Sequence, residues 1–348
     1  MKSHRVFISY SHQDKELVKK IEKVIRDNGM TPMLDEDFAF GHGFQDQIMT
    51  FVAHAHVFLP VITEASSARG WVHQEIGYAM AHHIPVLPVA LGALPGEMIQ
   101  QLHAVTLSED LHDLRDKLSK EVFDNLVKRY QDSRLAFFQC AEEHEERTAM
   151  MTQYANDVTG LGKHGLIRQK GGLSSFNIPA KIVSHLIWKE RYEPISKSQY
   201  YCRLQREERV ALEEHARESG CHLIINPYQK YEAYSVEAII VRLKTLLEFL
   251  ESMPDDKVQV AIAPELRPEE SFTIVGDWFV AECISTSSGH GYRQTIFTRH
   301  APTVWSKIEF FDEGFKELLK TSGWTAESSK AASIEAIHKV INGLKSNP

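Results

Sequence analysis

The chain has 348 residues, of which 43% are hydrophobic and 25% charged, and its formal net charge at pH 7 is −8. This length suffices for two domains, and the composition is typical of a folded globular protein. Residues 1–130 carry 13 Lys and Arg against 17 Asp and Glu, so a broad nucleic-acid-binding face is disfavoured. No apolar run approaches the roughly 20 residues that span a bilayer, and the first residues lack the pattern of a secretory signal, so we expect a cytoplasmic protein without a membrane anchor.

Residues 1–132 alternate strand-like and helix-like segments. Short apolar runs predict strands at 5–11, 31–35, 56–63, 84–91 and, more weakly, 103–108. Helical periodicity predicts helices at 14–29, 44–55, 70–83 and 110–132. This alternation predicts a parallel sheet with helices on both faces. Ligands of such sheets bind beyond the carboxyl ends of the strands, here in the loops after residues 11, 35, 63 and 91.

The pattern of helices and strands expected in residues 133–348 predicts a second domain of α/β or α+β class. Helices are expected at 137–158, 206–220, 236–252, 308–321 and 327–344, and strands at 222–227, 258–264, 271–283 and 292–298. Residues 159–180 are Gly-rich and interpreted as irregular. Two Gly-containing basic stretches, 160–172 and 287–293, are candidates for phosphate-holding loops or are ordinary surface loops.

The stretch "FISYSHQD" (7–14) is a strand whose end turns polar. Its hydroxyls and backbone N–H groups, close to the start of the next helix, suit phosphate or ribose oxygens. Helix capping by Ser11 or Asp14 explains the same residues equally well.

The stretch "LDEDFAFGHGF" (34–44) joins the second strand to a helix. It combines acids, aromatics and glycines, a composition found in lids and contact surfaces. The alternative is a surface loop with Phe38 and Phe40 tucked inward.

The stretch "GWVHQEIGYAM" (70–80) predicts a helix that follows a buried strand. The apolar stripe expected to pack on the sheet consists of Val72, Ile76, Ala79 and Met80. Trp71 and Glu75 are four residues apart, so they share a neighbouring face near the carboxyl edge of the sheet. Without further information, Glu75 is either a solvated helix residue or a group in the cleft.

Together these stretches resemble a TIR (Toll/interleukin receptor) domain of the bacterial branch. Three segments match in order and spacing: the F-I-S-Y-S opening at 7–11, the acidic loop after the second strand, and the W-x-x-x-E helix at 71–75. The resemblance covers about residues 4–130. It implies a flavodoxin-like TIR domain at residues 1–132, followed by a separate domain at 133–348.

Many TIR domains of this kind cleave NAD⁺ at the nicotinamide–ribose bond. The resemblance therefore implies an NAD⁺ hydrolase, with NAD⁺ as substrate and no cofactor. It implies that Glu75 is the catalytic carboxylate. The residues implied to meet the substrate or cover the site are Ser9, Tyr10, Ser11, Trp71 and, in the so-called BB loop that also joins neighbouring TIR domains, Asp35, Asp37 and Phe38.

Similar architectures act in antiphage defence, where a sensed signal assembles TIR domains and NAD is depleted. We therefore expect a homo-oligomer assembled through TIR domains, with residues 133–348 sensing an unknown trigger. Two alternatives remain: a TIR scaffold without catalysis, and a synthase of a cyclic ADP-ribose-type signal. Residues 270–319 also vaguely resemble the second half of a phospholipase-D-like domain, but the H-x-K signature is absent, so that activity would not carry over.

The remaining metal-ligating residue types form no recognisable site. The four cysteines are far apart and are expected to be reduced, buried thiols. His82 and His83 suit a helix end, whereas His42 and His73 could approach the cleft. No H-x-x-x-H pattern occurs, so we expect no metal.

Overall fold

The computed structural model describes residues 3–34, 44–67, 70–92, 104–132, 138–171, 176, 195–228, 236–266, 270–285 and 293–346. The chain forms two compact units. The first comprises Met1–Phe138 with Gly160–Gly162 and His300–Pro302, and the second comprises the remainder.

The first unit contains a parallel sheet in the order β2-β1-β3-β4-β5. Its strands are β1 (Arg5–Ser9), β2 (Thr31–Met33), β3 (Val57–Ile62), β4 (Val89–Leu91) and β5 (Val105–Leu107). The inner strands β1 and β3 are buried along their whole length, as expected for parallel strands covered on both faces. The predicted flavodoxin-like class is confirmed.

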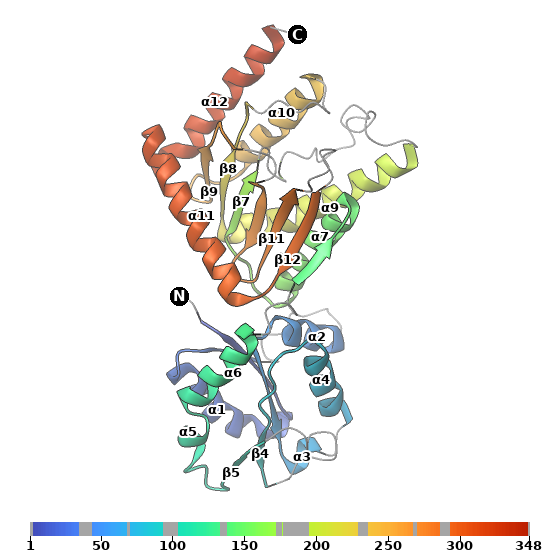
Figure 1. Ribbon diagram of the computed structural model, residues 1–348, viewed down its shortest axis with the longest axis vertical. Helices are drawn as coiled ribbons and strands as arrows, with labels where there is room; N and C mark the ends of the chain where they lie inside the picture. Colours follow the sequence, from blue (N-terminus) through green and yellow to red (C-terminus); the bar gives the residue numbers. More distant parts are fainter. Residues whose placement is uncertain are drawn as a thin grey trace. The chain divides into compact units, whose positions relative to one another are not determined.

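Helices cover both faces of this sheet. They are η1 (His12–Asp14), α1 (Lys15–Asp27), α2 (Phe44–His54), α3 (Glu64–Ser67), α4 (Gly70–Ala81), α5 (Leu114–Lys117) and α6 (Lys120–Asp132). Helices α1, α5 and α6 lie on one side, and α2 and α4 lie on the other (Figure 1). Ile21 and Ile25 of α1 and Phe123 of α6 are fully buried, and they join one apolar core with Val6 and Ile8 of β1.

Two predictions for this unit were wrong in detail. The single helix expected at 110–132 is interrupted at Leu118, whose carbonyl oxygen accepts a hydrogen bond from the Asn28 amide at 2.8 Å. The strand expected at 84–91 pairs regularly only from Val89, preceded by one isolated bridge between Phe58 and Val86. The prolines at 85 and 88 have no N–H to give to a sheet.

The second unit contains a seven-stranded mixed sheet in the order β6-β12-β11-β10-β7-β8-β9. Its strands are β6 (Phe138–Ala141), β7 (Ile167–Gly171), β8 (Cys221–Ile225), β9 (Val258–Ile262), β10 (Phe272–Val275), β11 (Phe279–Ser285) and β12 (Arg293–Thr298). Strands β7, β8 and β9 are parallel, whereas the pairs β7–β10, β10–β11 and β11–β12 are antiparallel. The prediction of a second domain with helices and strands is confirmed.

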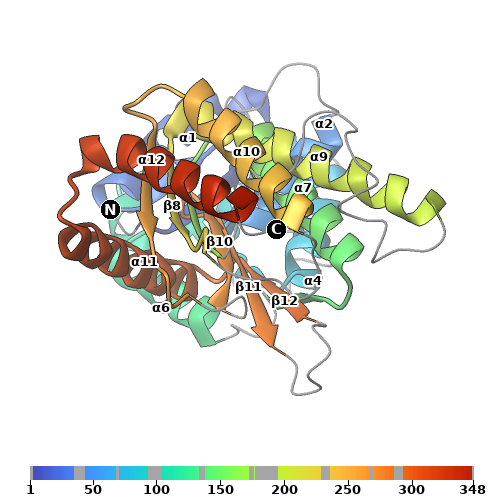
Figure 2. The same ribbon diagram turned by 90° about the horizontal axis from the view of Figure 1, so that it is seen from above.

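The helices of the second unit are α7 (His144–Gly160), α9 (Ile195–Ser219), α10 (Val236–Ser252), α11 (Ala301–Ser322) and α12 (Ala326–Ser346). In Figure 2, α11 lies on one side of the strands and α9 and α10 lie on the other. Phe311 and Phe315 of α11 pack against Ile274 of β10 and Val280 of β11 in one core.

Three predictions for the second unit need correction. The helix expected at 137–158 begins only at His144, because Phe138–Ala141 forms an edge strand beside β12. The segment interpreted as irregular contains β7, a central strand paired with both β10 and β8. The single run at 271–283 is a hairpin that turns at Gly276, where φ is +55°.

In the part of the chain that the structure describes, no helix is both long and apolar enough to span a lipid bilayer.

Candidate active site

Glu75 lies in the middle of α4, and its carboxylate meets the carboxyl end of β1. Its side chain is only 7% exposed. Its Oε2 accepts a hydrogen bond from the Ser9 hydroxyl at 2.5 Å. Ser9 is itself 6% exposed and is the last residue of β1. A solvated helix glutamate is therefore excluded, whereas the position of Glu75 in a ligand-binding cleft remains a prediction.

The rest of α4 explains why this carboxylate faces inward. Val72, Ile76 and Ala79 are buried, as the apolar stripe predicts. Met80 departs from that stripe and is 45% exposed. The buried face is therefore centred on 72, 75, 76 and 79, which is the spacing of one helix face. Glu75 shares this face, so the packing of the helix itself brings its carboxylate to the sheet.

Ser11 lies two residues beyond Ser9 and has a different environment. It is 1% exposed, and its Oγ has no hydrogen-bond partner among the described residues. Ser11 and Asp14 stand at the N-caps of η1 and α1, but neither side chain makes a capping hydrogen bond. The capping explanation for this polar stretch is therefore wrong. A buried hydroxyl without a partner costs free energy unless a ligand or water satisfies it.

Tyr10 lies between the two serines and is buried in the apolar core of the first unit. Its ring is 6.1 Å from that of His12, in an edge-to-face arrangement. Most of this ring contributes to packing. Its predicted role at the substrate remains a prediction.

A second set of hydrogen bonds ties together the loops that follow β1 and β3. The Thr63 hydroxyl donates to Asp14 Oδ2 at 2.9 Å. The Thr63 N–H donates to Ser66 Oγ at 2.8 Å, and that hydroxyl donates to the Val61 carbonyl oxygen at 2.9 Å. These contacts brace the loop that carries Ser11 against the segment that leads into α4.

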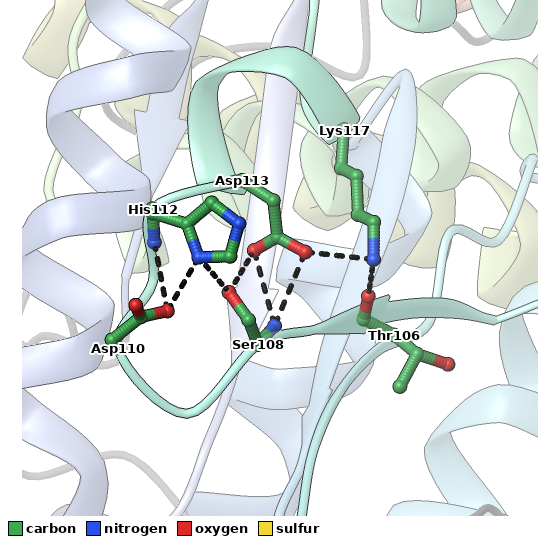
Figure 3. Close-up of polar contacts among 6 residues, drawn as sticks. All are labelled: Thr106, Ser108, Asp110, His112, Asp113 and Lys117. Atoms are coloured by element: carbon green, nitrogen blue, oxygen red, sulfur yellow. Dashed lines mark hydrogen bonds and ion pairs between the residues drawn. The ribbon is translucent and has the colours of Figure 1, made fainter.

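A polar cluster that the sequence reading missed follows β5, at the same sheet edge (Figure 3). His112 Nδ1 lies 2.6 Å from Asp110 Oδ1 and 3.0 Å from Ser108 Oγ. Asp113 accepts from Ser108 Oγ at 2.7 Å and pairs with Lys117 at 2.8 Å. The hydrogen bond to Asp110 raises the pKa of His112.

This Ser–His–Asp grouping is not a hydrolytic triad. A triad needs the serine on one ring nitrogen and the acid on the other. Here Ser108 and Asp110 both contact Nδ1, and the imidazole of His112 is exposed. The cluster closes the turn between β5 and α5, and the run "SEDLHD" is its signal in the sequence.

Comparison with known families identifies the first unit. A model described as "TIR domain" matches residues 6–121. Residues 6–121 form a TIR domain. The family includes NADases, and the second unit is a separate domain that follows it.

The chain is also similar to solved structures of TIR domains. The TIR domain of the Toll-related receptor TRR-2 from Hydra magnipapillata is 15% identical, with 35% of this chain and 96% of that chain covered and a TM-score of 0.29. The TIR domains of the activated Roq1 resistosome, which recognises the pathogen effector XopQ, are 15% identical, with 36% and 84% covered and a TM-score of 0.25. TM-scores of this size do not support any conclusion about this chain. Comparison with curated proteins produced no match.

Several predicted residues of the TIR site cannot be placed. Asp35, Asp37, Phe38 and His42 lie outside the described residues. For Trp71 the structure describes its place in α4 and not its side chain. Among the predicted residues, the structure therefore joins Ser9 to Glu75. Ser11 lies two residues beyond Ser9 in the chain, and the rest of the substrate pocket remains a prediction.

The described part of the chain contains no group of three or more His, Cys, Asp or Glu side chains suited to a metal ion. The four cysteines are free thiols, but only Cys221 is buried, which corrects the expectation that all four would be. Burial raises the pKa of the Cys221 thiol.

The basic side chains of the predicted phosphate loop at 160–172 belong largely to strand β7. Arg168 Nε lies 2.7 Å from Asp312 Oδ1, and Lys170 Nζ lies 3.1 Å from Glu270 Oε2. Cations already paired with carboxylates are poor phosphate ligands, so this interpretation is not supported. Most of the second predicted loop, 287–293, lies outside the described residues.

Proposed function

We propose that this chain is an NAD⁺ hydrolase in which Glu75 is the catalytic carboxylate. The observation that supports this most is the buried contact between Glu75 and Ser9 at the carboxyl edge of a TIR-domain sheet. A buried carboxylate held at the ligand-binding edge of a parallel sheet is a common feature of active sites and an expensive one in a purely structural position.

The chemistry requires one carboxylate and no proton donor. Nicotinamide is a cation in NAD⁺ and leaves as a neutral base when the bond to ribose breaks. Positive charge then develops on the ribose as an oxocarbenium ion. A fixed carboxylate near this ring stabilises that charge as it forms, as carboxylates do in glycosidases. Water then attacks the anomeric carbon, and ADP-ribose is released.

Within the same proposal, Ser11 helps to bind the substrate. Its buried hydroxyl could donate to a ribose or phosphate oxygen, and such a contact would satisfy the group. Trp71, Asp35, Asp37 and Phe38 complete the proposed pocket by family resemblance, and Tyr10 and Ser9 complete the loop beside it.

We further propose that the protein is an effector of prokaryotic immunity. In this proposal residues 133–348 form a sensing and oligomerisation domain, and an unidentified trigger assembles the TIR domains at residues 1–132. Assembly controls activity because the BB loop of one protomer covers the site of its neighbour.

The direct test incubates the purified full chain with NAD⁺, with and without conditions that promote assembly, and separates the products by chromatography. Nicotinamide and ADP-ribose in equal amounts are the expected products. Release of nicotinamide together with a cyclic isomer of ADP-ribose would indicate synthesis of a cyclic signal instead of hydrolysis. The absence of nicotinamide release in every assembly state would favour a scaffold and contradict the proposal.

A further inference from the structure

The Ser9 hydroxyl and the Glu75 carboxylate come from two elements of different rigidity. Ser9 ends β1, a strand paired on both sides, and its register partner in β3 is Pro60. Pairing with β2 ends at Phe7, so it is the pairing with β3 that holds the Ser9 Cα in place. A serine side chain has only one heavy-atom torsion. The hydroxyl is therefore a fixed point at the carboxyl edge of the sheet.

Glu75 is different because its side chain has three torsions between the helix backbone and the carboxylate. Burial of α4 on the sheet places the Glu75 Cα but does not by itself fix these torsions. The 2.5 Å hydrogen bond to Ser9 Oγ defines where Oε2 lies. Hydrogen bonds to an ionised acceptor are short and strong, and burial of both partners keeps water from competing for them.

We infer that Ser9 is a positioning residue, which holds the Glu75 carboxylate in the orientation that the reaction uses. The inference rests on the proposed function for its catalytic consequence. It differs from the role expected from the family resemblance, in which Ser9 meets the substrate. The two roles are compatible, because a hydroxyl that donates to Glu75 keeps two lone pairs to accept from a ligand.

Ser11 provides the natural comparison two residues away. It is as buried as Ser9, yet its hydroxyl has no partner within the described ranges. Loss of the Ser11 hydroxyl therefore removes a possible substrate contact and leaves the Glu75 carboxylate where it is. The two serines should affect different kinetic constants.

The experiment measures kcat and KM for NAD⁺ cleavage by the full chain and by four serine variants. We expect Ser9→Ala to lower kcat about 10- to 100-fold and to change KM by less than about threefold, because the carboxylate loses its orientation in the transition state. Ser9→Thr keeps a hydroxyl and a residue type suited to strands, so it should recover kcat to within about fivefold. Ser11→Ala should mainly raise KM, and Ser108→Ala, in the turn after β5, should change neither constant.

A second measurement does not depend on activity. Urea unfolding and hydrogen exchange of peptides from α4 compare Ser9→Ala, Glu75→Ala and the double variant in the full chain. We expect Ser9→Ala to lower the protection of α4 against hydrogen exchange when Glu75 is present. In the Glu75→Ala background the same substitution should have little further effect. Equal effects in both backgrounds would show that the two groups are not coupled.

The two measurements separate failure of the inference from failure of the proposed function. A chain that never releases nicotinamide, but in which the two variants are coupled, contradicts the hydrolase and retains the role of Ser9 in holding Glu75. If the parent chain cleaves NAD⁺ and Ser9→Ala raises only KM, the positioning role is overturned and Ser9 is a substrate contact. The same holds if Ser9→Thr behaves like Ser9→Ala while both variants fold as stably as the parent.

Discussion

Gly165 and Gly276 of the second unit approach each other so closely that neither position accommodates a side chain. A Cβ on Gly165 would lie 2.5 Å from the Gly276 Cα, and Gly276 has a φ of +55°. We expect Gly165→Ala to lower the free energy of unfolding of the second unit by about 1–3 kcal/mol, because the backbone of the β10–β11 turn must move. Gly314→Ala in α11 is the matched control, because a Cβ at this position would meet nothing within 4 Å. This substitution should stabilise the helix by about 0.5–1 kcal/mol. Urea unfolding followed by circular dichroism tests both, and equal effects would contradict the steric argument.

Replacement of the Glu75 carboxylate by an amide should suppress the chemical step. Glu75→Gln keeps the size of the side chain and removes its charge, so we expect kcat to fall about 10²- to 10³-fold while NAD⁺ still binds. Glutamate 121 in α6 is exposed, so Glu121→Gln changes the net charge equally without touching the site. Nicotinamide release measures kcat, and titration calorimetry measures binding. Full activity of Glu75→Gln would rule out Glu75 as the charge-stabilising group.

The hydrogen bonds between Thr63, Asp14 and Ser66 should contribute to both stability and activity. Thr63→Val preserves the shape of the side chain but removes its donation to Asp14 Oδ2. It also leaves the Ser66 N–H without the Thr63 hydroxyl that it contacts at 3.3 Å. We expect a loss of about 1–2 kcal/mol in unfolding free energy and a higher KM, because the loop carrying Ser11 is less well held. Thr152→Val on α7 removes a hydroxyl that donates to the Thr148 carbonyl oxygen within its own helix in the second unit, and KM should not respond to it.

Acidification should destabilise the first unit through His4. Burial and the neighbouring Arg5 lower the pKa of His4 from 6.5 to about 4. The unfolded chain therefore binds a proton below pH 6.5 that the folded chain accepts only near pH 4, so stability falls as pH decreases through this window. Because His4 is only half-buried, solvent screening reduces the loss to about 1–2 kcal/mol.

The measurement compares urea midpoints at pH 7.5 and 5.0 for the parent and for His4→Gln, and the variant should lose less stability on acidification. His112→Gln is the control with the opposite sign, because its hydrogen bond to Asp110 raises the pKa of His112 and so favours folding at low pH. An identical acid response in the parent and His4→Gln would contradict the assignment.

Removing one partner of the ion pair between Arg168 and Asp312 should destabilise the fold strongly. Replacing both partners by apolar residues should destabilise it much less. Two hydrogen bonds of 2.7 and 3.1 Å join the guanidinium on β7 to the carboxylate on α11, and the Arg168 side chain is 14% exposed. Asp312→Ala leaves a largely buried cation, so we expect a loss of about 2–4 kcal/mol. The double variant Arg168→Met with Asp312→Leu should recover most of that loss, and thermal denaturation of the three proteins provides the comparison. A double variant less stable than Asp312→Ala would show that the pair itself stabilises the fold.

Strand β7 illustrates why sequence analysis failed in part of the second unit. Arg168 and Lys170 alternate with Ile167, Gln169 and Gly171, so the segment lacks the continuous apolar run expected of a central strand. Its charges are compensated by Asp312 and Glu270, which are 144 and 100 residues away in the chain. No local pattern contains that information. The edge strand β6 was missed for a similar reason, because it pairs with β12, more than 150 residues later.

The sequence by itself determined the class of the first unit and the helix that carries Glu75. Regular alternation of apolar strands and amphipathic helices is a local property, and it predicted the parallel sheet and the edge at which a ligand would bind. The motifs at 7–11 and 71–75 also identified the TIR resemblance. Only the tertiary structure decided that Glu75 is buried and bonded to Ser9, and that Ser11 is buried without a partner in the described residues. Ser9 and Glu75 are 66 residues apart, and only the packing of α4 on the sheet brings the hydroxyl and the carboxylate together.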